Sequence, residues 1–373
     1  MDKPIKVLII DDSAFNRRTL TKLLESVRGV EVVGVAVDGR DGLKQVAKLK
    51  PDLITLDMEM PVMDGFTFLR ILMQTNPIPV IVISSRNADA NVFKAMELGA
   101  VDFIPKPTAI PSMALFNIKD ELCQKVMMLS HLRMEKVRSV QALIRPGVVK
   151  PLEDVRAEDK KEAPFPHGVL ETEIGFDVVA IGSSTGGPPA LSTILPLFPE
   201  GFPVSVVISQ HMPPGFTKPF AERLNKMCKM RVKEAADGEV VKKGDILITP
   251  GGYHLSFKRC RNGEIVTNLL EKREEDTYAP SVDIMFSSAA TIWGKKVMGI
   301  ILTGMGYDGK EGVMRIKQQG GYVIAESEET SIVFGMPESA IATGMVDEVA
   351  PLYKIGSRIV KGCITGLEKG LDI

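Results

Sequence analysis

Two sets of reactive side chains stand in series along this chain, and each set is suited to a different chemistry. The first set ends successive apolar runs in the N-terminal third; it comprises Asp11, Asp12, Asp57, Ser84 and Lys106. In the second half, Ser184 and Asp308 stand in glycine-rich turns, and His211 follows an apolar run. The first set can hold a metal ion and a phosphoryl group, and the second can attack a carbonyl group. A phosphorylation site joined to a hydrolytic site predicts a switched enzyme.

The residues of the first set stand at or just after the ends of short β-branched runs. The runs are Lys6–Ile10, Glu31–Ala36, Leu53–Leu56, Val80–Ile83 and Asp102–Ile104. Runs such as VLII and VIVIS are apolar on both faces, as buried parallel strands are, and segments of helical spacing separate them. This alternation predicts a doubly wound α/β domain with five strands. Reactive groups gather beyond the carboxyl ends of such strands, so these side chains should share one cleft.

Three clustered carboxylates repel one another unless a cation lies among them, and Mg²⁺ prefers such oxygen ligands. One carboxylate can then attack phosphorus, while the lysine and the hydroxyl bind phosphoryl oxygens. The alternative is that Asp11 and Asp12 only cap a helix that starts near Ser13, and that Lys106 is a surface lysine. The occurrence of all these residues at strand ends, in order, favours the functional interpretation.

The segments IIDDS, LDMEMPVMDG, VIVISS and DFIPKP resemble the motifs of response-regulator receiver domains, over essentially all of residues 1–125. The resemblance implies a flavodoxin-like fold and phosphorylation of Asp57. It implies that Asp11, Asp12 and Asp57 hold Mg²⁺, with Ser84 and Lys106 at the phosphoryl group. It also places Phe103 at the aromatic switch position, for which a plain core aromatic residue is the alternative.

Ser184 lies in the segment IGSSTGG, between an apolar run and a helical pattern. A serine in such a strand–turn–helix lies near the N–H groups of a helix N-terminus, which favour developing negative charge. A phosphate-binding glycine loop and a purely structural turn are the alternatives. The glycine spacing fits neither the dinucleotide nor the P-loop pattern, which disfavours a nucleotide site.

A serine nucleophile needs a base, and the chain has four histidines. His131 and His167 lie in or near a predicted linker. His211 follows VSVVISQ directly at a strand end, whereas His254 starts a hairpin strand, so position favours His211. Asp308 follows another predicted strand and can orient the His211 ring, although it can also be the N-cap of the next helix.

A second βα series starts at Phe176 and predicts a C-terminal Rossmann-like α/β domain. YHLSFKR and EIVTNLL flank a turn at Asn262–Gly263 and predict an antiparallel hairpin, so we expect a mixed sheet. Four prolines and the charged run RAEDKKE predict an interdomain linker. The predicted organisation is a receiver domain at 1–125, a linker at 126–173 and a catalytic domain at 174–373.

The segments AIGSSTGG, ISQHMPPGFT, ITPGGYH and ILTGMGYDG, together with the receiver motifs, resemble the chemotaxis response-regulator protein-glutamate methylesterases, the CheB family. The resemblance implies Ser184 as nucleophile, His211 as general base and Asp308 as the orienting acid. It also implies an oxyanion hole that includes the backbone N–H of Met305, with Thr185 assisting.

Two positions depart from the family pattern. Ser183 stands where a small apolar residue is usual, and Tyr307 stands where asparagine is frequent. The register still selects Ser184. We expect Tyr307 to alter the surface around the site without abolishing the chemistry.

The implied reaction is phosphorylation-activated hydrolysis of glutamate γ-methyl esters on chemoreceptors, with release of methanol, together with deamidation of receptor glutamines in sensory adaptation. The implied partners are methyl-accepting chemoreceptors as substrate and a chemotaxis histidine kinase as phosphodonor. We expect Mg²⁺ in the receiver domain and no cofactor in the catalytic domain. Without phosphorylation, the receiver is expected to cover the active site.

Composition limits the alternatives. The 373 residues exceed one ordinary core, and 45% hydrophobic with 25% charged residues is typical of soluble globular proteins. The chain shows neither a signal peptide nor an apolar run of membrane length, so we expect a cytoplasmic protein without membrane insertion. Lys+Arg number 46 against 47 Asp+Glu, without a basic block, which disfavours nucleic acid as a partner. Four scattered cysteines fit a reducing compartment.

Three other classes stay open at this point. They are a phosphorylation-controlled interaction protein with an inert C-terminal domain, a receiver-linked transcription factor, and an ordinary lipase or peptidase. The strand-rich C-terminal half, with no compact helix-turn-helix pattern, disfavours the transcription factor.

Overall fold

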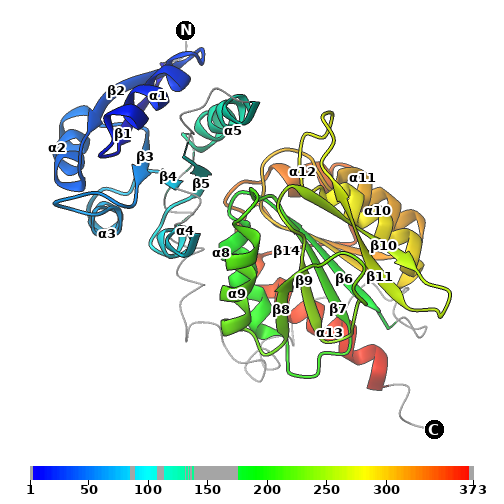
Figure 1. Cartoon of the computed structure of the whole chain (residues 1–373). Helices are drawn as coiled ribbons and strands as arrows, with labels where there is room; N and C mark the ends of the chain where they lie inside the picture. Colours follow the sequence, from blue (N-terminus) through cyan, green and yellow to red (C-terminus); the bar gives the residue numbers. More distant parts are fainter. Residues whose placement is uncertain are drawn as a thin grey trace. The chain divides into compact units, whose positions relative to one another are not determined.

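The structure is a computed structural model of the whole chain, which divides into two compact units, Met1–Gln141 and Ala142–Ile373 (Figure 1). It describes residues 3–84, 89–106, 113–130, 132, 134, 137 and 175–368. The predicted linker, 126–173, falls mostly outside these residues, as do His131 and His167; its first residues belong to helix α5, Met113–Leu129. Each unit is described below by itself.

The first unit is built on a five-stranded parallel sheet with the strand order β2-β1-β3-β4-β5. The strands are β1 (Ile5–Ile10), β2 (Val30–Ala36), β3 (Leu53–Asp57), β4 (Val80–Ser84) and β5 (Asp102–Pro105). The helices between them are α1 (Ala14–Glu25), α2 (Gly39–Leu49), α3 (Gly65–Thr75) and α4 (Asp89–Glu97). This order is that of flavodoxin-like doubly wound sheets, so the predicted receiver fold is confirmed.

The second unit contains a seven-stranded sheet with the order β14-β13-β12-β6-β7-β9-β8. Its strands are β6 (Val178–Ser183), β7 (Ser205–Gln210), β8 (Arg231–Glu234), β9 (Asp245–Ile248), β12 (Val297–Ile301), β13 (Tyr322–Glu326) and β14 (Glu348–Ala350). Every pairing in this sheet is parallel. The α/β class is therefore confirmed, but the expected mixed sheet is wrong.

The antiparallel hairpin is real, but it lies outside the large sheet. Its strands, β10 (Tyr253–Arg259) and β11 (Ile265–Glu271), form a separate two-stranded sheet. Leu255 and Phe257 of β10 belong to the hydrophobic cluster that also contains residues of helix α10, Val282–Trp293. The hairpin thus buries its apolar face against a helix, which leaves the large sheet purely parallel.

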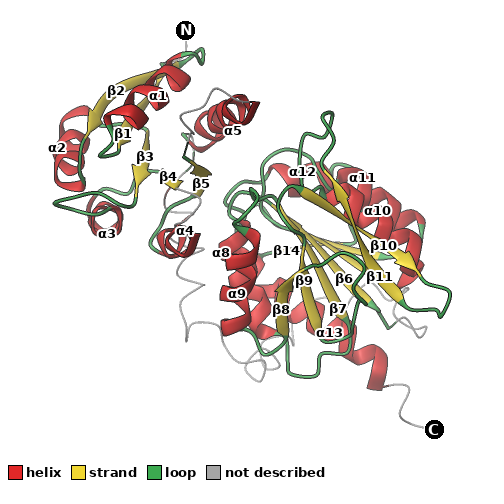
Figure 2. Ribbon diagram, in the orientation of Figure 1, coloured by secondary structure: helices red, strands yellow, loops and turns green. Residues whose placement is uncertain are grey.

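Helices cover both faces of the large sheet (Figure 2). Helix α8 (Gly187–Ile194) packs with α9 (Thr217–Met227) and α13 (Leu352–Glu368). Helix α10 packs with α11 (Lys310–Gln318), which in turn contacts α12 (Gly335–Ile341). Within the described residues, no helix combines the length and apolar character that crossing a membrane requires.

The strand order reverses between β6 and β12. The chain builds outward from β6 through β7 and later returns to β12, from which it builds outward in the other direction. In open α/β sheets, sites form beyond the carboxyl ends of the strands at such a reversal. Ser184 follows β6, His211 follows β7 and Asp308 lies in the loop after β12. The topology therefore brings the second predicted set to one edge of the sheet.

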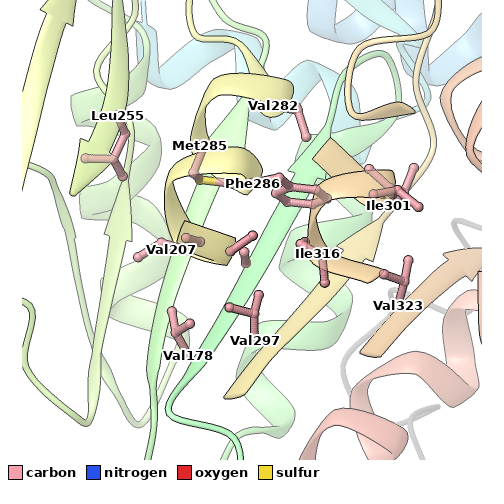
Figure 3. Packing of buried hydrophobic residues seen from close by; sticks show 14 of the residues in the cluster. Val178, Val207, Leu255, Val282, Met285, Phe286, Val297, Ile301, Ile316 and Val323 are labelled. Atoms are coloured by element: carbon pink, nitrogen blue, oxygen red, sulfur yellow. The ribbon is translucent and has the colours of Figure 1, made fainter. Parts of the chain in front are cut away.

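Helix α10 lies against this reversal point because of its sequence. Ser281 is its N-cap, since the Ser281 hydroxyl accepts the Ile284 N–H. Val282, Met285 and Phe286 recur at helical spacing and are fully buried in the core (Figure 3). On the strand side, a Cβ atom at Gly182 would lie 2.3 Å from Cγ1 of Val282. Glycine at position 182 therefore lets the first turn of α10 approach β6.

This close approach predicts that Gly182→Ala destabilises the second unit by about 1–3 kcal/mol, because the added methyl group overpacks the core. Removing the methyl groups that it would meet, in Gly182→Ala/Val282→Ala, should recover part of that loss. The measurement is the unfolding transition of the second unit in all variants, with Val282→Ala as the control. Simple additivity of the two single changes would contradict the proposed contact.

Candidate functional site

The ends of three neighbouring strands position the second set of residues. Ser183 on β6 pairs with Gln210 on β7, and Gly182 pairs with Ile301 on β12. Backbone hydrogen bonds continue past these strand ends: the His211 N–H donates to the Ser183 carbonyl at 3.0 Å, and the Ser184 N–H donates to the Thr303 carbonyl at 3.1 Å. The backbones of Ser184 and His211 are thus held as extensions of the sheet.

The Gln210 side chain links the backbones of Ser184 and His211 by hydrogen bonds. Its Nε2 donates to the carbonyl oxygens of Ser184, at 2.9 Å, and His211, at 3.0 Å. Its Oε1 accepts the Ser183 hydroxyl at 2.7 Å, and Ser183 is fully buried. Ser184 is only partly buried, so it is the serine that faces outward. Gln210 was not predicted from the sequence; its position directly before His211 was the available signal.

The turn around Ser184 depends on close backbone approaches. Gly186 has φ of +80°, and helix α8 starts at the next residue. Across the turn, a Cβ atom at Gly304 would lie 2.8 Å from the Ser184 Cβ. Met305, which follows Gly304, therefore lies on the loop that faces Ser184. Among the contacts of the described residues, none uses the Met305 N–H. Thr185, beside Ser184, is buried.

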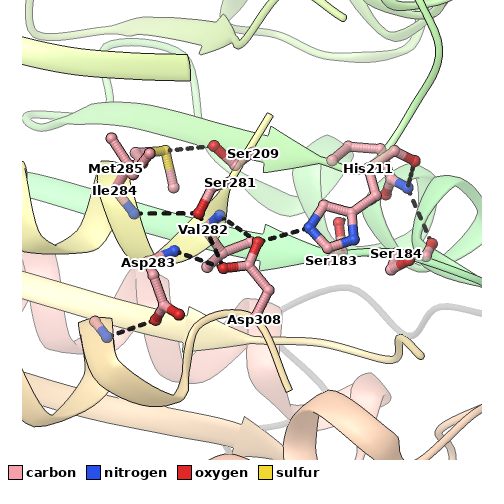
Figure 4. Close-up of polar contacts among 12 residues, drawn as sticks. Ser183, Ser184, Ser209, His211, Ser281, Val282, Asp283, Ile284, Met285 and Asp308 are labelled. Carbon is pink, nitrogen blue, oxygen red and sulfur yellow. Dashed lines mark hydrogen bonds and ion pairs between the residues drawn. The ribbon is translucent and has the colours of Figure 1, made fainter. Parts of the chain in front are cut away.

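Asp308 holds His211 and the N-terminus of α10 together (Figure 4). Its Oδ2 lies 2.7 Å from His211 Nε2 and accepts the Val282 N–H at 2.7 Å. Its Oδ1 accepts the Ser281 hydroxyl and the Asp283 N–H, both at 3.0 Å. The predicted alternative, a cap on the following helix, is not what forms: the N-cap of α11 is Gly309, and Asp308 binds the positive end of α10 instead.

These contacts set the charges of the pair. Burial raises the pKa of the Asp308 carboxyl, but the hydrogen bond and charge of His211 and the backbone N–H donors outweigh it and lower the pKa overall. An ionised Asp308 accepts the Nε2 proton of a neutral imidazole. The lone pair then lies on Nδ1, which is buried and has no hydrogen-bond partner among the described residues. The Ser184 hydroxyl does not bond to it in this structure, and apo sites often show such loose geometry.

His254, the alternative base, is engaged on both ring nitrogens. Its Nε2 lies 2.9 Å from Asp276 Oδ2, and its Nδ1 accepts the Ser281 N–H at 3.1 Å. The residue is buried. His254 therefore has no ring nitrogen left for a substrate, whereas His211 has one.

A cleft of about 180 Å³ opens beside Asp308, and Tyr278, Asp283 and Tyr307 help to line it. The Tyr278 ring stacks on the His211 ring, with 4.4 Å between centroids and 8° between planes. Burial, with the nearby charge of Asp308, raises the pKa of Asp283 to about 7. Tyr307 is 63% exposed, so this departure from the family pattern lies on the surface. Neither the stacking of Tyr278 on His211 nor the position of Asp283 in the cleft had a sequence signal.

The first predicted set also gathers at one end of its sheet. One oxygen each from Asp11, Asp12 and Asp57 lies within 4.8 Å of the others, and Lys106 Nζ lies 2.7 Å from Asp57 Oδ2. Ser13, not the aspartates, is the N-cap of α1; Asp11 accepts the Ser13 N–H at 2.8 Å. The two simple alternatives, helix caps and a surface lysine, thus do not describe these residues.

The electrostatics of this first site fit a divalent cation. Burial, followed by the charge of Asp57, raises the pKa of Asp11 to about 6. Burial also raises the pKa of Asp57, despite the opposing effect of Lys106. Three clustered carboxylate oxygens, only partly compensated by Lys106, are the kind of ligand set that Mg²⁺ prefers.

Ser84 lies on β4, the strand next to that of Asp57, and Phe103 lies on β5, one strand further. Ser84 is buried at the end of β4, and its carbonyl accepts the Lys106 N–H at 2.7 Å. Phe103 is buried on β5, and Nζ of Lys125 lies 5.8 Å from its ring centroid. Phe103 occupies a core position in this structure.

Comparisons with known proteins agree with both units. Residues 7–115 match the family model of the response regulator receiver domain, and residues 179–359 match that of CheB methylesterase. The chain is 47% identical to protein-glutamate methylesterase/protein-glutamine glutaminase 3 of Geobacter sulfurreducens, over 99% of this chain and 100% of that protein. It is 41% identical to the corresponding protein of Caldanaerobacter subterraneus, over 97% of each.

Among solved structures, the Thermotoga maritima CheB methylesterase catalytic domain is 46% identical; the match covers 50% of this chain and 99% of that chain, with a TM-score of 0.49. The two units define a response regulator joined to an enzymatic output domain. The chain belongs to the CheB family of protein-glutamate methylesterases/protein-glutamine glutaminases, as its motifs predicted.

The raised pKa of Asp11 predicts how the receiver unit depends on pH. The folded state binds the Asp11 proton more tightly than the unfolded state, so ionisation destabilises the fold as pH rises through about 6. In metal-free buffer, Asp11→Asn should therefore be more stable than wild type at pH 7.5, and this difference should vanish as pH falls towards about 4.

The measurement is the unfolding transition of the receiver unit between pH 4 and 8. Glu31→Gln, at an exposed position of β2, is the matched control. A difference between Asp11→Asn and wild type that does not change with pH would contradict the assignment.

Proposed function

We propose that this chain is a phosphorylation-activated protein-glutamate methylesterase that hydrolyses glutamate γ-methyl esters on chemoreceptors and also deamidates receptor glutamines. The observation that carries the proposal is the His211–Asp308 pair, which leaves Nδ1 of His211 without a partner among the described residues, at the end of the strand paired with the one that Ser184 follows. Relatives at 47% and 41% identity over nearly the whole chain are named protein-glutamate methylesterase/protein-glutamine glutaminase, which supports the same reaction. Ser184, His211 and Asp308 are the catalytic residues of this proposal.

In the proposed mechanism, the Ser184 hydroxyl turns to Nδ1 of His211 when substrate binds. Nδ1 takes the hydroxyl proton as the serine oxygen attacks the ester carbonyl, and Asp308 stabilises the resulting imidazolium. The proton then passes from Nδ1 to the leaving methoxide, and methanol departs. Water repeats the sequence on the glutamyl-enzyme and restores Ser184 and a free glutamate. With glutamine as substrate, ammonia leaves in place of methanol.

The proposed oxyanion hole is the gap between the Ser184 turn and the facing loop. Gly304 lies against Ser184, and the next N–H, that of Met305, has no partner among the described contacts. An N–H in this position can donate to the developing oxyanion. Thr185, the residue after the nucleophile, is the second proposed contributor.

Replacing Ser184 with alanine should lower methanol release from methylated receptor membranes by a factor of at least about 10³, since it removes the nucleophile. Asp308→Asn should lower it by about 10²–10⁴, because an amide stabilises neither the correct tautomer nor the imidazolium. Release is measured with radiolabelled methyl groups, and circular dichroism verifies the fold of each variant.

The control is Ser192→Ala, which removes a hydroxyl of α8 whose hydrogen bond, within the described part of the chain, goes to the Pro188 carbonyl. Near-normal release from Ser184→Ala would refute the assignment and favour an interaction protein with an inert domain. Hydrolysis of small acyl esters without receptor demethylation would favour an ordinary esterase.

We propose that the chain divides into a receiver at 1–125, a linker at 126–173 and a catalytic domain at 174–373. Asp57 is the proposed phosphoryl acceptor, and Ser84 and Lys106 bind the phosphoryl oxygens. Asp11, Asp12 and Asp57 are the proposed Mg²⁺ ligands; when bound, the ion supplies positive charge that offsets the carboxylates and the phosphoryl group. Phe103 is the proposed switch residue.

The proposed partners follow from the proposed reaction. They are methyl-accepting chemoreceptors as substrate and a chemotaxis histidine kinase as phosphodonor, in the cytoplasm, with adaptation of chemotaxis as the outcome. Phosphorylation of Asp57 shifts the receiver towards an arrangement that admits the receptor.

Acetyl phosphate with Mg²⁺ should raise methanol release several-fold in the wild-type chain, and Asp57→Asn should abolish this increase while its basal release stays unchanged. EDTA should remove the activation without lowering basal release, because the proposed hydrolytic residues bind no metal. Equal activation of Asp57→Asn, or loss of basal release in EDTA, would contradict the separation of a metal-dependent input from a metal-free output.

A further inference from the structure

The His211 side chain contacts Tyr278 as well as Asp308. Tyr278 stands in the loop at 272–281, between β11 and α10, and its ring lies parallel to the imidazole at 4.4 Å. The ring is half-buried, and burial together with the charges of Asp308 and Tyr307 raises its pKa, so the stacked group is a neutral phenol. The hydroxyl of Tyr278 lies against the loop after β12, since a Cβ atom at Gly306 would lie 2.5 Å from the hydroxyl oxygen.

The hydrogen bond to Asp308 alone does not fix the His211 ring. It holds Nε2 at one point, and the ring can still swing about that point, which would move Nδ1 away from Ser184. A parallel aromatic face restricts this swing. It also stabilises the imidazolium that forms when Nδ1 takes a proton, because the face of an aromatic ring attracts a cation.

The loop that carries Tyr278 is anchored on both sides by His254. Before Tyr278, Asp276 binds His254 Nε2 and also accepts the N–H and a guanidinium N–H of Arg273, each at 2.8 Å. After Tyr278, the Ser281 N–H donates to His254 Nδ1. The Ser281 hydroxyl in turn donates to Asp308. The buried His254 is thus linked to both contacts of the His211 ring: through the loop to Tyr278, which stacks on its face, and through Ser281 to Asp308, which binds its Nε2.

We propose that Tyr278 is a positioning residue, which holds the His211 ring with Nδ1 towards Ser184, and that the His254–Asp276 pair fixes the loop from which Tyr278 acts. This inference rests on the proposed function of Ser184 and His211. It assigns the second histidine–aspartate pair of the domain a role in catalysis without contact to substrate.

The test compares Tyr278→Phe, which keeps the aromatic face, with Tyr278→Leu, which removes it at similar volume. Two reactions are followed in the full-length chain: covalent labelling of Ser184 by a small fluorophosphonate probe, and methanol release from methylated receptor membranes. Tyr253→Leu, at an exposed tyrosine of β10, is the control. Thermal unfolding shows whether each variant keeps its fold.

Tyr278→Phe should stay within about twofold of wild type in both reactions. Tyr278→Leu should lose about 10–100-fold in labelling rate and in kcat, with KM changed less than about twofold, because a misplaced base impairs the chemical step. His254→Gln should lower the same quantities in the same direction. Added to Tyr278→Leu, His254→Gln should lower these rates little further, because both changes remove the same positioning of His211.

Three outcomes would overturn the inference. Normal labelling of Tyr278→Leu would show that the ring does not position His211. A loss confined to the receptor reaction, with raised KM, would make Tyr278 a substrate contact. An equal loss in Tyr278→Phe would assign the effect to the hydroxyl. In all three, Ser184→Ala stays inactive; activity of Ser184→Ala would instead overturn the proposed function and this inference with it.

Discussion

The second unit depends on one buried carboxylate, that of Asp308. A buried charge is costly unless donors surround it, and Asp308 receives two backbone N–H groups, a serine hydroxyl and the imidazole of His211. Three of these donors belong to the beginning of α10. The carboxylate can therefore serve His211 only if that helix begins next to the strand ends, which in turn requires the glycine at position 182.

Two polar networks meet at His211, one on each side of the strand edge. Gln210 holds the backbones of Ser184 and His211 from within the sheet, and every donor and acceptor of its amide is used. Asp308, Ser281 and His254 hold the side chain from the α10 side. Buried networks of this kind rigidify a site only when their members are satisfied. Among the described residues of these networks, the imidazole Nδ1 is the exception, and a ring nitrogen without a partner fits the general base proposed above.

The sequence predicted those features that follow from local pattern. Buried parallel strands are apolar on both faces, so β1, β3, β6, β7 and β12 were visible, and with them the polar residues that follow them. The edge strands β8 and β14 lack such runs and were missed. The purely parallel sheet was not predicted, because a hairpin pattern does not say which surface its strands cover. The stacking of Tyr278 and the binding of Asp308 to the start of α10 depend on contacts between distant segments, and no local spacing encodes them.

The two sites differ in how their negative charge is compensated, and this difference bears on the proposed control of the second site by the first. At Asp11 and Asp57, burial and mutual repulsion exceed the available donors, and both pKa values are raised. At Asp308 the donors exceed the cost of burial, and the pKa is lowered. In the proposed function, the first site is stabilised by an added cation and its balance of charge changes when a phosphoryl group arrives. The second site is already compensated, and any change to its geometry would forfeit hydrogen bonds. For the proposed activation, a change in access to Ser184 therefore costs less than a change in the His211–Asp308 pair.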